Sequence, residues 1–252
     1  MTMEDETHLA PQDSTVRVLI VIDSKGHDAI RFSELMQEII PEEARAVKEL
    51  GFSFKFTVQA PDDFNFLVNG SRLLVDHDVL LWQTTGGHLE QDEQAGLIEY
   101  VKAGGSFVGV HCAADSFVQA DNWDYWRLIG AQFRTHPAFG DVEGRIAMPE
   151  HPTMQGLSNP IVIPDEEYVC AWHPNPIGEP LVKLIHAKWL ARPWAFEIQQ
   201  GGPDDEICIT HCKDVEHGRV FWTGYGHNSI AWYNPDFINM IGNALLWTAK
   251  RT

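Results

Sequence analysis

The sequence predicts a doubly wound α/β fold with a largely parallel sheet. Two continuous apolar runs, VRVLIVID at 16–23 and DVLLWQ at 78–83, suit central parallel strands that are covered on both faces. Segments with helical spacing of apolar residues lie between the strands, as in βαβ units. A chain of 252 residues is long enough for one large domain of this kind. We therefore expect a flexible N-terminal tail at 1–15 and a single α/β domain at 16–252.

The remaining elements of the first half follow in order. Residues 31–50 carry apolar positions at helical spacing, and Pro41 is expected to start a second helical piece or to bend one. FSFKFTV at 52–58 alternates like a strand. Residues 90–105 open with acidic side chains and end in two glycines, which is typical of a capped helix. SFVGV at 106–110 then supplies a fourth strand.

The second half has shorter β-like pieces between Pro-rich and Gly-rich turns. They lie at 144–148, 168–172, 181–185, 207–212 and 219–224. These pieces could extend the main sheet or form an antiparallel layer against it. A final helix follows, with Asn234 as its cap and Pro235 at its first position.

Composition excludes several partners and locations. The net charge of −18 repels phosphate backbones and anionic membranes, so we expect no nucleic-acid or membrane partner. No apolar stretch approaches the roughly 18 residues of a membrane span, and the acidic start is unlike a signal peptide. Four cysteines without a CxxC motif are typical of reduced, packed thiols. These features predict a cytoplasmic protein. Aromatic residues of the second half could also form a homodimer surface.

Histidines follow the predicted strand ends. His27, His88 and His111 come after the first, third and fourth strands, and His136 and His227 lie in later loops. Because ligands of such a sheet bind beyond the carboxyl ends of its strands, these rings could converge on a metal or move protons. No HExxH or HxH spacing occurs, so the ligands would come from distant loops, and each histidine could also be structural.

The segment GVHCA at 109–113 resembles a strand-turn-helix elbow, in which the third residue lies at the tip. In that register His111 occupies the tip and Cys112 packs against the next turn. The amides of Gly86 and Gly87 could still contact an oxyanion. A hydrolase with Cys112 as its nucleophile therefore stays open as an alternative.

Aromatic and acidic side chains provide further candidates. Trp123, Trp126 and Trp232 lie in predicted loops or short helices, where their flat rings suit the faces of sugars. Asp165, Glu166 and Glu167 form an acidic run that could contribute a ligand or a general base. A solvated turn is the alternative for this run.

Several motifs in order resemble the trehalose-utilisation (ThuA-like) family. They are GGHLEQDEQAGLIEYVKAGGSFVGVHCAAD, YWRLIGAQFRTHP, EHPTMQGL, PDEEY and GRVFWTGYGH, followed by Trp232. The resemblance runs from about Val16 to the C-terminal helix. It implies the class I glutamine amidotransferase-like fold, a flavodoxin-like three-layer α/β/α sandwich whose mostly parallel sheet carries added β pieces in the C-terminal half.

The resemblance also implies a function. The family's motif histidines correspond to His27, His111, His136 and His227, which we expect to bind a divalent metal, zinc in particular. Asp28 or Glu166 would orient a ligand or move a proton, with His111 in the catalytic centre. The expected substrate is a small carbohydrate, a disaccharide or keto-sugar. Glutamine hydrolysis is not expected, because His111 replaces the elbow cysteine and His227 is followed by Asn228 and Ser229 without an acid. The alternative is a non-catalytic sugar-binding or regulatory module on the same scaffold.

Overall fold

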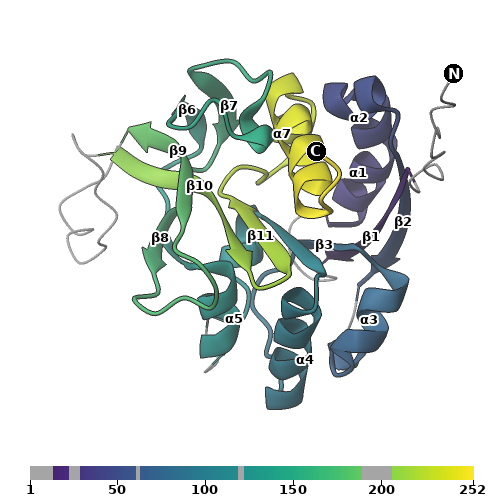
Figure 1. Ribbon diagram of the computed structural model, residues 1–252. Helices are drawn as coiled ribbons and strands as arrows, with labels where there is room; N and C mark the ends of the chain where they lie inside the picture. The colour runs from purple at the N-terminus through teal and green to yellow at the C-terminus, as the bar shows by residue number, and fades with distance from the viewer. Residues whose placement is uncertain (1–13, 23–28, 61–62, 119–121, 189–205) are drawn as a thin grey trace, which may run out of the picture.

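The protein is described by a computed structural model over residues 14–22, 29–60, 63–118, 122–188 and 206–252. Eleven strands occur in these residues: β1 (Thr15–Ile22), β2 (Ser53–Gln59), β3 (Val79–Gln83), β4 (Ser106–Val110), β5 (Ala131–Thr135), β6 (Gly140–Ile146), β7 (Ile161–Asp165), β8 (Val169–Trp172), β9 (Val182–Lys188), β10 (Glu206–Val215) and β11 (Gly218–Thr223). Nine of them form one sheet in the order β2-β1-β3-β4-β11-β10-β9-β6-β7, and β5 pairs with β8 in a separate ribbon (Figure 1).

β2, β1, β3, β4 and β11, which are neighbours in the sheet, run parallel to one another. Their ends determine where the functional loops lie. β1 pairs with β2 and β3, β3 with β4, and β4 with β11, each in parallel register. Val110 at the end of β4 lies opposite Thr223 at the end of β11. The loops that leave these two strands therefore start side by side at the carboxyl edge of the sheet, although they are more than a hundred residues apart in sequence.

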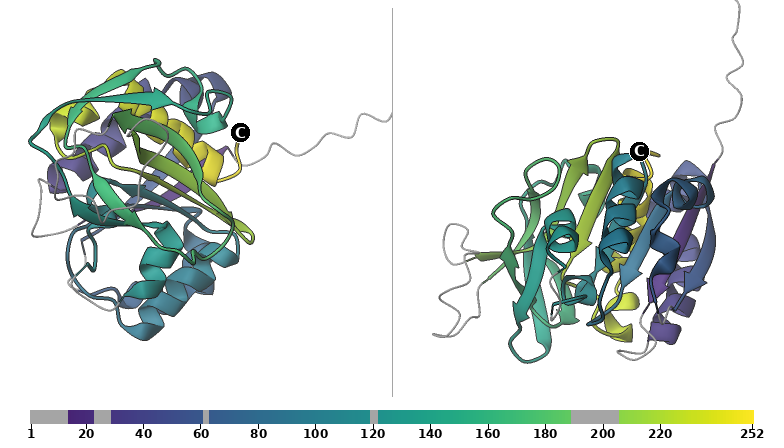
Figure 2. Two further views of the ribbon diagram at one scale, coloured as in Figure 1. Left: turned by 90° about the vertical axis from the view of Figure 1, so that its left-hand side faces the viewer. Right: turned by 90° about the horizontal axis from the view of Figure 1, so that it is seen from below.

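Helices cover both faces of the sheet, which confirms the three-layer α/β/α sandwich. They are α1 (Ala29–Glu43), α2 (Arg45–Leu50), α3 (Gly70–Asp76), α4 (Gln91–Lys102), α5 (Trp123–Ile129), α6 (Ser229–Trp232) and α7 (Pro235–Thr248). In Figures 1 and 2, α1, α2 and α7 lie on one face, and α3, α4 and α5 lie on the other. Each layer buries its own apolar cluster against the sheet. No helix in the described part of the chain is long and apolar enough to cross a membrane.

Helix ends follow their capping residues. Glu90 and Glu93 form a reciprocal capping box at the start of α4. Asn234 accepts hydrogen bonds from the backbone amides of Asp236 and Phe237 at the start of α7, as predicted. Pro41 does not start a second helical piece, because it lies inside the last part of α1, which ends before Ala44, a residue with extended backbone.

The short β pieces of the second half realise both arrangements that the sequence allowed. β6, β7, β9 and β10 extend the main sheet through antiparallel pairs. β8 instead pairs with β5 to form the separate antiparallel ribbon. This ribbon begins next to the carboxyl edge of the sheet, where Tyr168 precedes β8, and it contributes to the site described next.

Candidate metal centre

His111 is the first residue after β4 and is completely buried. Its φ of +45° is uncommon outside glycine, and such conformations cluster at functional sites. The ring Nδ1 lies 2.6 Å from the carbonyl oxygen of Gly224, which can only accept, so Nδ1 carries the proton. The other nitrogen, Nε2, therefore has a lone pair available in the neutral ring. Tyr168 packs against the same imidazole, with ring centroids 3.7 Å apart.

His227 reaches His111 from the loop after β11. Gly226 precedes it with φ +117°, a conformation that suits glycine. A Cβ at Gly226 would also lie 2.5 Å from a methyl carbon of Val110, so the loop passes too close to β4 for any side chain there. The turn brings Nδ1 of His227 to 3.2 Å from Nε2 of His111.

Glu166 completes the cluster from the end of β7. Its Oε2 lies 3.1 Å from Nδ1 of His227 and 3.5 Å from Nε2 of His111. Burial alone would raise the pKa of Glu166, but hydrogen bonding and positive charge from the imidazoles of His111, His227 and His136, when these rings are protonated, lower it. The carboxylate is therefore ionised at neutral pH.

Asp165 holds the backbone of this cluster in place. Its buried carboxylate accepts hydrogen bonds from the amides of Glu166 at 2.8 Å, Gly226 at 2.6 Å and His227 at 3.2 Å. One side chain thus connects the end of β7 with the loop after β11. Burial raises the pKa of Asp165 to about 7, although the three amide hydrogen bonds oppose this shift.

The ligand atoms of His111, Glu166 and His227 all lie within 4.8 Å of one another. Three electron-pair donors at this spacing need a proton or a cation between them. Two imidazoles and one carboxylate form a donor set known for catalytic zinc and for non-haem iron. The Nδ1–H bond from His111 to Gly224 is also the outer-shell contact that orients metal-binding histidines. These residues fit a divalent transition metal.

The structure places the other predicted ligands differently. Nε2 of His136 lies 3.6 Å from Oε2 of Glu166, so His136 borders the centre, but it is not part of the compact three-residue group. His27 and Asp28 lie outside the described residues, and their roles stay predictions.

The glycine loop after β3 forms backbone hydrogen bonds with the turn that follows His111. Gly86 and Gly87 both have positive φ. The amide of Gly86 donates to the carbonyl of Asp115, and its own carbonyl accepts from the amide of Phe117. The hydrogen that Gly86 was expected to offer to an oxyanion is therefore already bonded.

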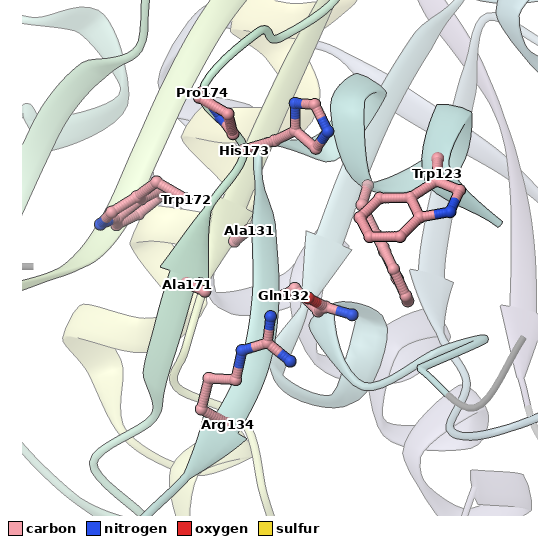
Figure 3. A pocket seen from close by; sticks show the side chains of 9 residues that line it. Trp123, Ala131, Gln132, Arg134, Ala171, Trp172, His173 and Pro174 are labelled. Carbon is pink, nitrogen blue, oxygen red and sulfur yellow. The ribbon is translucent and has the colours of Figure 1, made fainter. Parts of the chain in front are cut away.

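The three tryptophans predicted to contact sugar have different environments. Trp232 is completely buried and packs against Phe32 and Phe237, so its ring has no exposed face for a sugar. Trp123 and Trp126 lie on α5 and line a separate hollow (Figure 3).

Cys112 is only 2% exposed, which agrees with a packed thiol rather than a nucleophile at the tip of the elbow. All four cysteines lie in the described part of the chain, where they are buried and none forms a disulfide.

Sequence reasoning grouped Asp165 with Glu166 and Glu167 as a possible ligand or general base and did not predict its bonds to backbone amides, and it missed Tyr168. One signal was present for Asp165: Ile161, Ile163 and Asp165 recur at the two-residue period of β7, and all three are buried. An acid in the buried register of a strand needs partners, which the reading of a solvated turn overlooked. Tyr168 carries no comparable signal, because its contact with His111 depends on the path of the chain between β7 and β8.

Comparison with known proteins supports the same architecture. A putative ThuA-like protein from Bacteroides uniformis superimposes with a TM-score of 0.66 at 19% identity, covering 97% of this chain and 95% of that one. A second from Parabacteroides merdae gives 0.66 at 17% identity, covering 93% and 90%. A cytoplasmic protein from Salmonella typhimurium gives 0.53 at 11% identity, covering 92% and 99%.

Sequence comparison then identifies the family. No curated protein sequence matches the chain significantly. The sequence model of the ThuA family, described as trehalose utilisation, matches residues 7–248. The chain therefore belongs to the ThuA family.

Proposed function

We propose that the protein is a metal-dependent enzyme that acts on a disaccharide or keto-sugar. One observation carries the proposal: donor atoms from three distant segments converge, and the Gly224 carbonyl fixes the proton of His111 on the nitrogen that faces away from them. Two imidazoles and a carboxylate whose ligand atoms converge within 4.8 Å form the donor set of a catalytic metal site. The substrate class rests on the family's description as trehalose utilisation.

His111, Glu166 and His227 would hold the ion, and zinc is the metal we propose. A bound zinc ion supplies a Lewis acid that polarises a sugar carbonyl or hydroxyl. Around it, Asp165 fixes the backbone that presents Glu166 and His227, and Tyr168 holds the face of His111. The arrangement is preorganised by the protein, because every ligand is restrained by a second contact.

His136 is the residue we propose for proton transfer. Its Nδ1 lies 2.8 Å from the carbonyl oxygen of Pro137, so the neutral ring carries its lone pair on Nε2, beside Glu166. The side chain is 36% exposed, which leaves it within reach of a bound substrate. It can take a proton from a sugar hydroxyl and return it to a leaving oxygen. Asp28 remains a further candidate for this role.

Turnover of 3-keto-trehalose, followed by chromatography, tests the proposal. We expect activity in the zinc-loaded protein, loss after treatment with a chelator, and recovery when zinc is restored. His111→Ala should be inactive, whereas His88→Ala should match the wild type, because His88 is exposed and pairs only with Glu90 among the described contacts. Activity that is indifferent to the chelator would overturn the metal-dependent reaction. Sugar binding without any product would assign the non-catalytic alternative.

We also propose a cytoplasmic location, in line with the Salmonella typhimurium neighbour that is described as cytoplasmic.

A further inference from the structure

A hollow of about 210 Å³ lies between α5 and the β5–β8 ribbon, apart from the metal centre. Its principal side chains are Trp123, Gln132, Arg134 and His173 (Figure 3). In the same view Trp172 points away from these four, so its indole is not part of the polar side of the hollow.

A bulge in the ribbon orients the side chains around this hollow. Phe133 pairs with Cys170 and Thr135 pairs with Val169, which leaves Arg134 as an extra residue between them. Bulges of this kind redirect a side chain and are common beside active sites.

Neighbouring residues of β5 serve the two faces of the ribbon. Phe133 packs on Tyr168 at 4.4 Å, and Tyr168 packs on His111. Gln132 and Arg134, the residues on either side of Phe133, line the hollow instead. The ribbon therefore separates the hollow from the metal centre.

Trp123 provides an exposed aromatic surface beside polar groups. Its side chain is 53% exposed, and the ring of Trp126 supports it edge-on at 5.2 Å. An exposed indole is unusual in a chain that buries most of its large apolar residues. Its position on a rigid pair of rings suits stacking with a flat, CH-rich ligand surface.

Arg134 and Gln132 provide directional donors beside that surface. Within the described residues Arg134 makes no ion pair or hydrogen bond, although the protein has twice as many acidic as basic side chains. A guanidinium has five N–H donors in a fixed plane, and an amide side chain adds donors and an acceptor. His173 uses Nδ1 in a local turn with Asn175, which leaves its other nitrogen for a ligand.

We propose that this hollow is a second carbohydrate-binding site, distinct from the metal centre, that holds one sugar ring. The ring would stack on Trp123, and its hydroxyls would bind Arg134, Gln132 and His173. The volume is below the roughly 300 Å³ at which pockets for drug-sized ligands begin, so it suits one ring rather than a whole disaccharide. The choice of a sugar rests on the proposed function, whereas the position of the site does not.

Calorimetric titration of the chelator-treated protein with trehalose tests the site without turnover. We expect the wild type to bind, Trp123→Ala to lose affinity by about tenfold or more, and Arg134→Gln to lose about threefold to tenfold. His111→Ala should bind within about twofold of the wild type, since His111 lies across the ribbon. Trp123 and Arg134 are both exposed, so the Trp123→Ala and Arg134→Gln variants should fold. Tyr233→Ala, an exposed aromatic on the α6 side of the protein, and Arg72→Gln on α3 are the matched controls.

Several results would overturn this site. They are no trehalose binding by the wild type, wild-type affinity in Trp123→Ala, or loss of binding in His111→Ala. Binding of inorganic phosphate in place of trehalose would also overturn it, because Arg134 would then select an anion. Turnover of 3-keto-trehalose is measured on the same variants after loading with zinc. This measurement separates a failure of the second site from a failure of the proposed function, because the enzyme can stay active when the hollow binds no sugar.

Discussion

Replacing Asp165 with asparagine keeps the shape of the side chain but removes one of the two oxygens that connect β7 with the loop after β11, and also the charge that the carboxylate carries above its raised pKa of about 7. In the wild type Oδ1 accepts from Glu166 and His227, and Oδ2 accepts from Gly226. Asparagine has one acceptor oxygen, so at least one buried amide would face an NH₂ group instead. A hydrogen bond to a charged group contributes about 1.5–3 kcal/mol, and the unpaired donor adds to the cost. We expect the free energy of unfolding to fall by about 2–4 kcal/mol.

Thermal unfolding and zinc titration measure the two consequences of Asp165→Asn. For a protein of this size the melting temperature should fall by about 5–15 °C. Zinc affinity should fall by about 10- to 100-fold, the usual effect of removing an outer-shell partner. Asp76→Asn is the matched control, because Asp76 is on the surface of α3 and should change stability by less than about 0.5 kcal/mol. Wild-type melting and zinc affinity in Asp165→Asn would refute the role of this carboxylate.

Three further changes test other parts of the structure. Partial burial alone would raise the pKa of Asp78, but hydrogen bonds from Arg17 hold it below its usual 3.8. The pair therefore stabilises the fold above pH 4, and this contribution is lost as the pH falls through the lowered pKa. Asp78→Asn should therefore cost about 1 kcal/mol in urea unfolding at pH 7, and a difference that persists below the lowered pKa would contradict this. Gly226→Ala should destabilise by about 2–4 kcal/mol through its clash with Val110 and its positive φ, and unchanged urea unfolding would be inconsistent with the close approach of the loop. Cys112→Ala should keep turnover of 3-keto-trehalose within about twofold, whereas complete loss would restore the thiol as a nucleophile.

The parallel half of the fold was predictable because its signals are local. A continuous apolar run marks a strand buried on both faces, and this identified β1, β3 and β4 to within a residue or two. The antiparallel half was harder to predict from the sequence. The short pieces that became β8 and β9 have similar composition, yet one joins the ribbon and the other the main sheet. That choice depends on long-range pairing, which short sequence patterns do not encode.

The same distinction applies to the site. His111 was predictable at the end of a parallel strand, whereas the sequence left open whether 219–224, the strand before His227, joins the main sheet; the structure places β11 parallel to β4. Glu166 was identified as one of three acids in the run 165–167, but the sequence did not show that it would lie beside His111 and His227. Trp232 shows the opposite case, since a tryptophan in a short helix looks the same in sequence whether it faces solvent or, as here, packs between Phe32 and Phe237.

Metal analysis tests most directly whether His111, Glu166 and His227 share one ion. The protein would be purified without added metal, stripped with a chelator, titrated with zinc and analysed by inductively coupled plasma mass spectrometry. We expect about one zinc ion per chain in the wild type and in His88→Ala, and less than about a tenth of that in His111→Ala. Equal metal content in the wild type and His111→Ala, whether both are near zero or both near one, would contradict a metal centre at the end of β4.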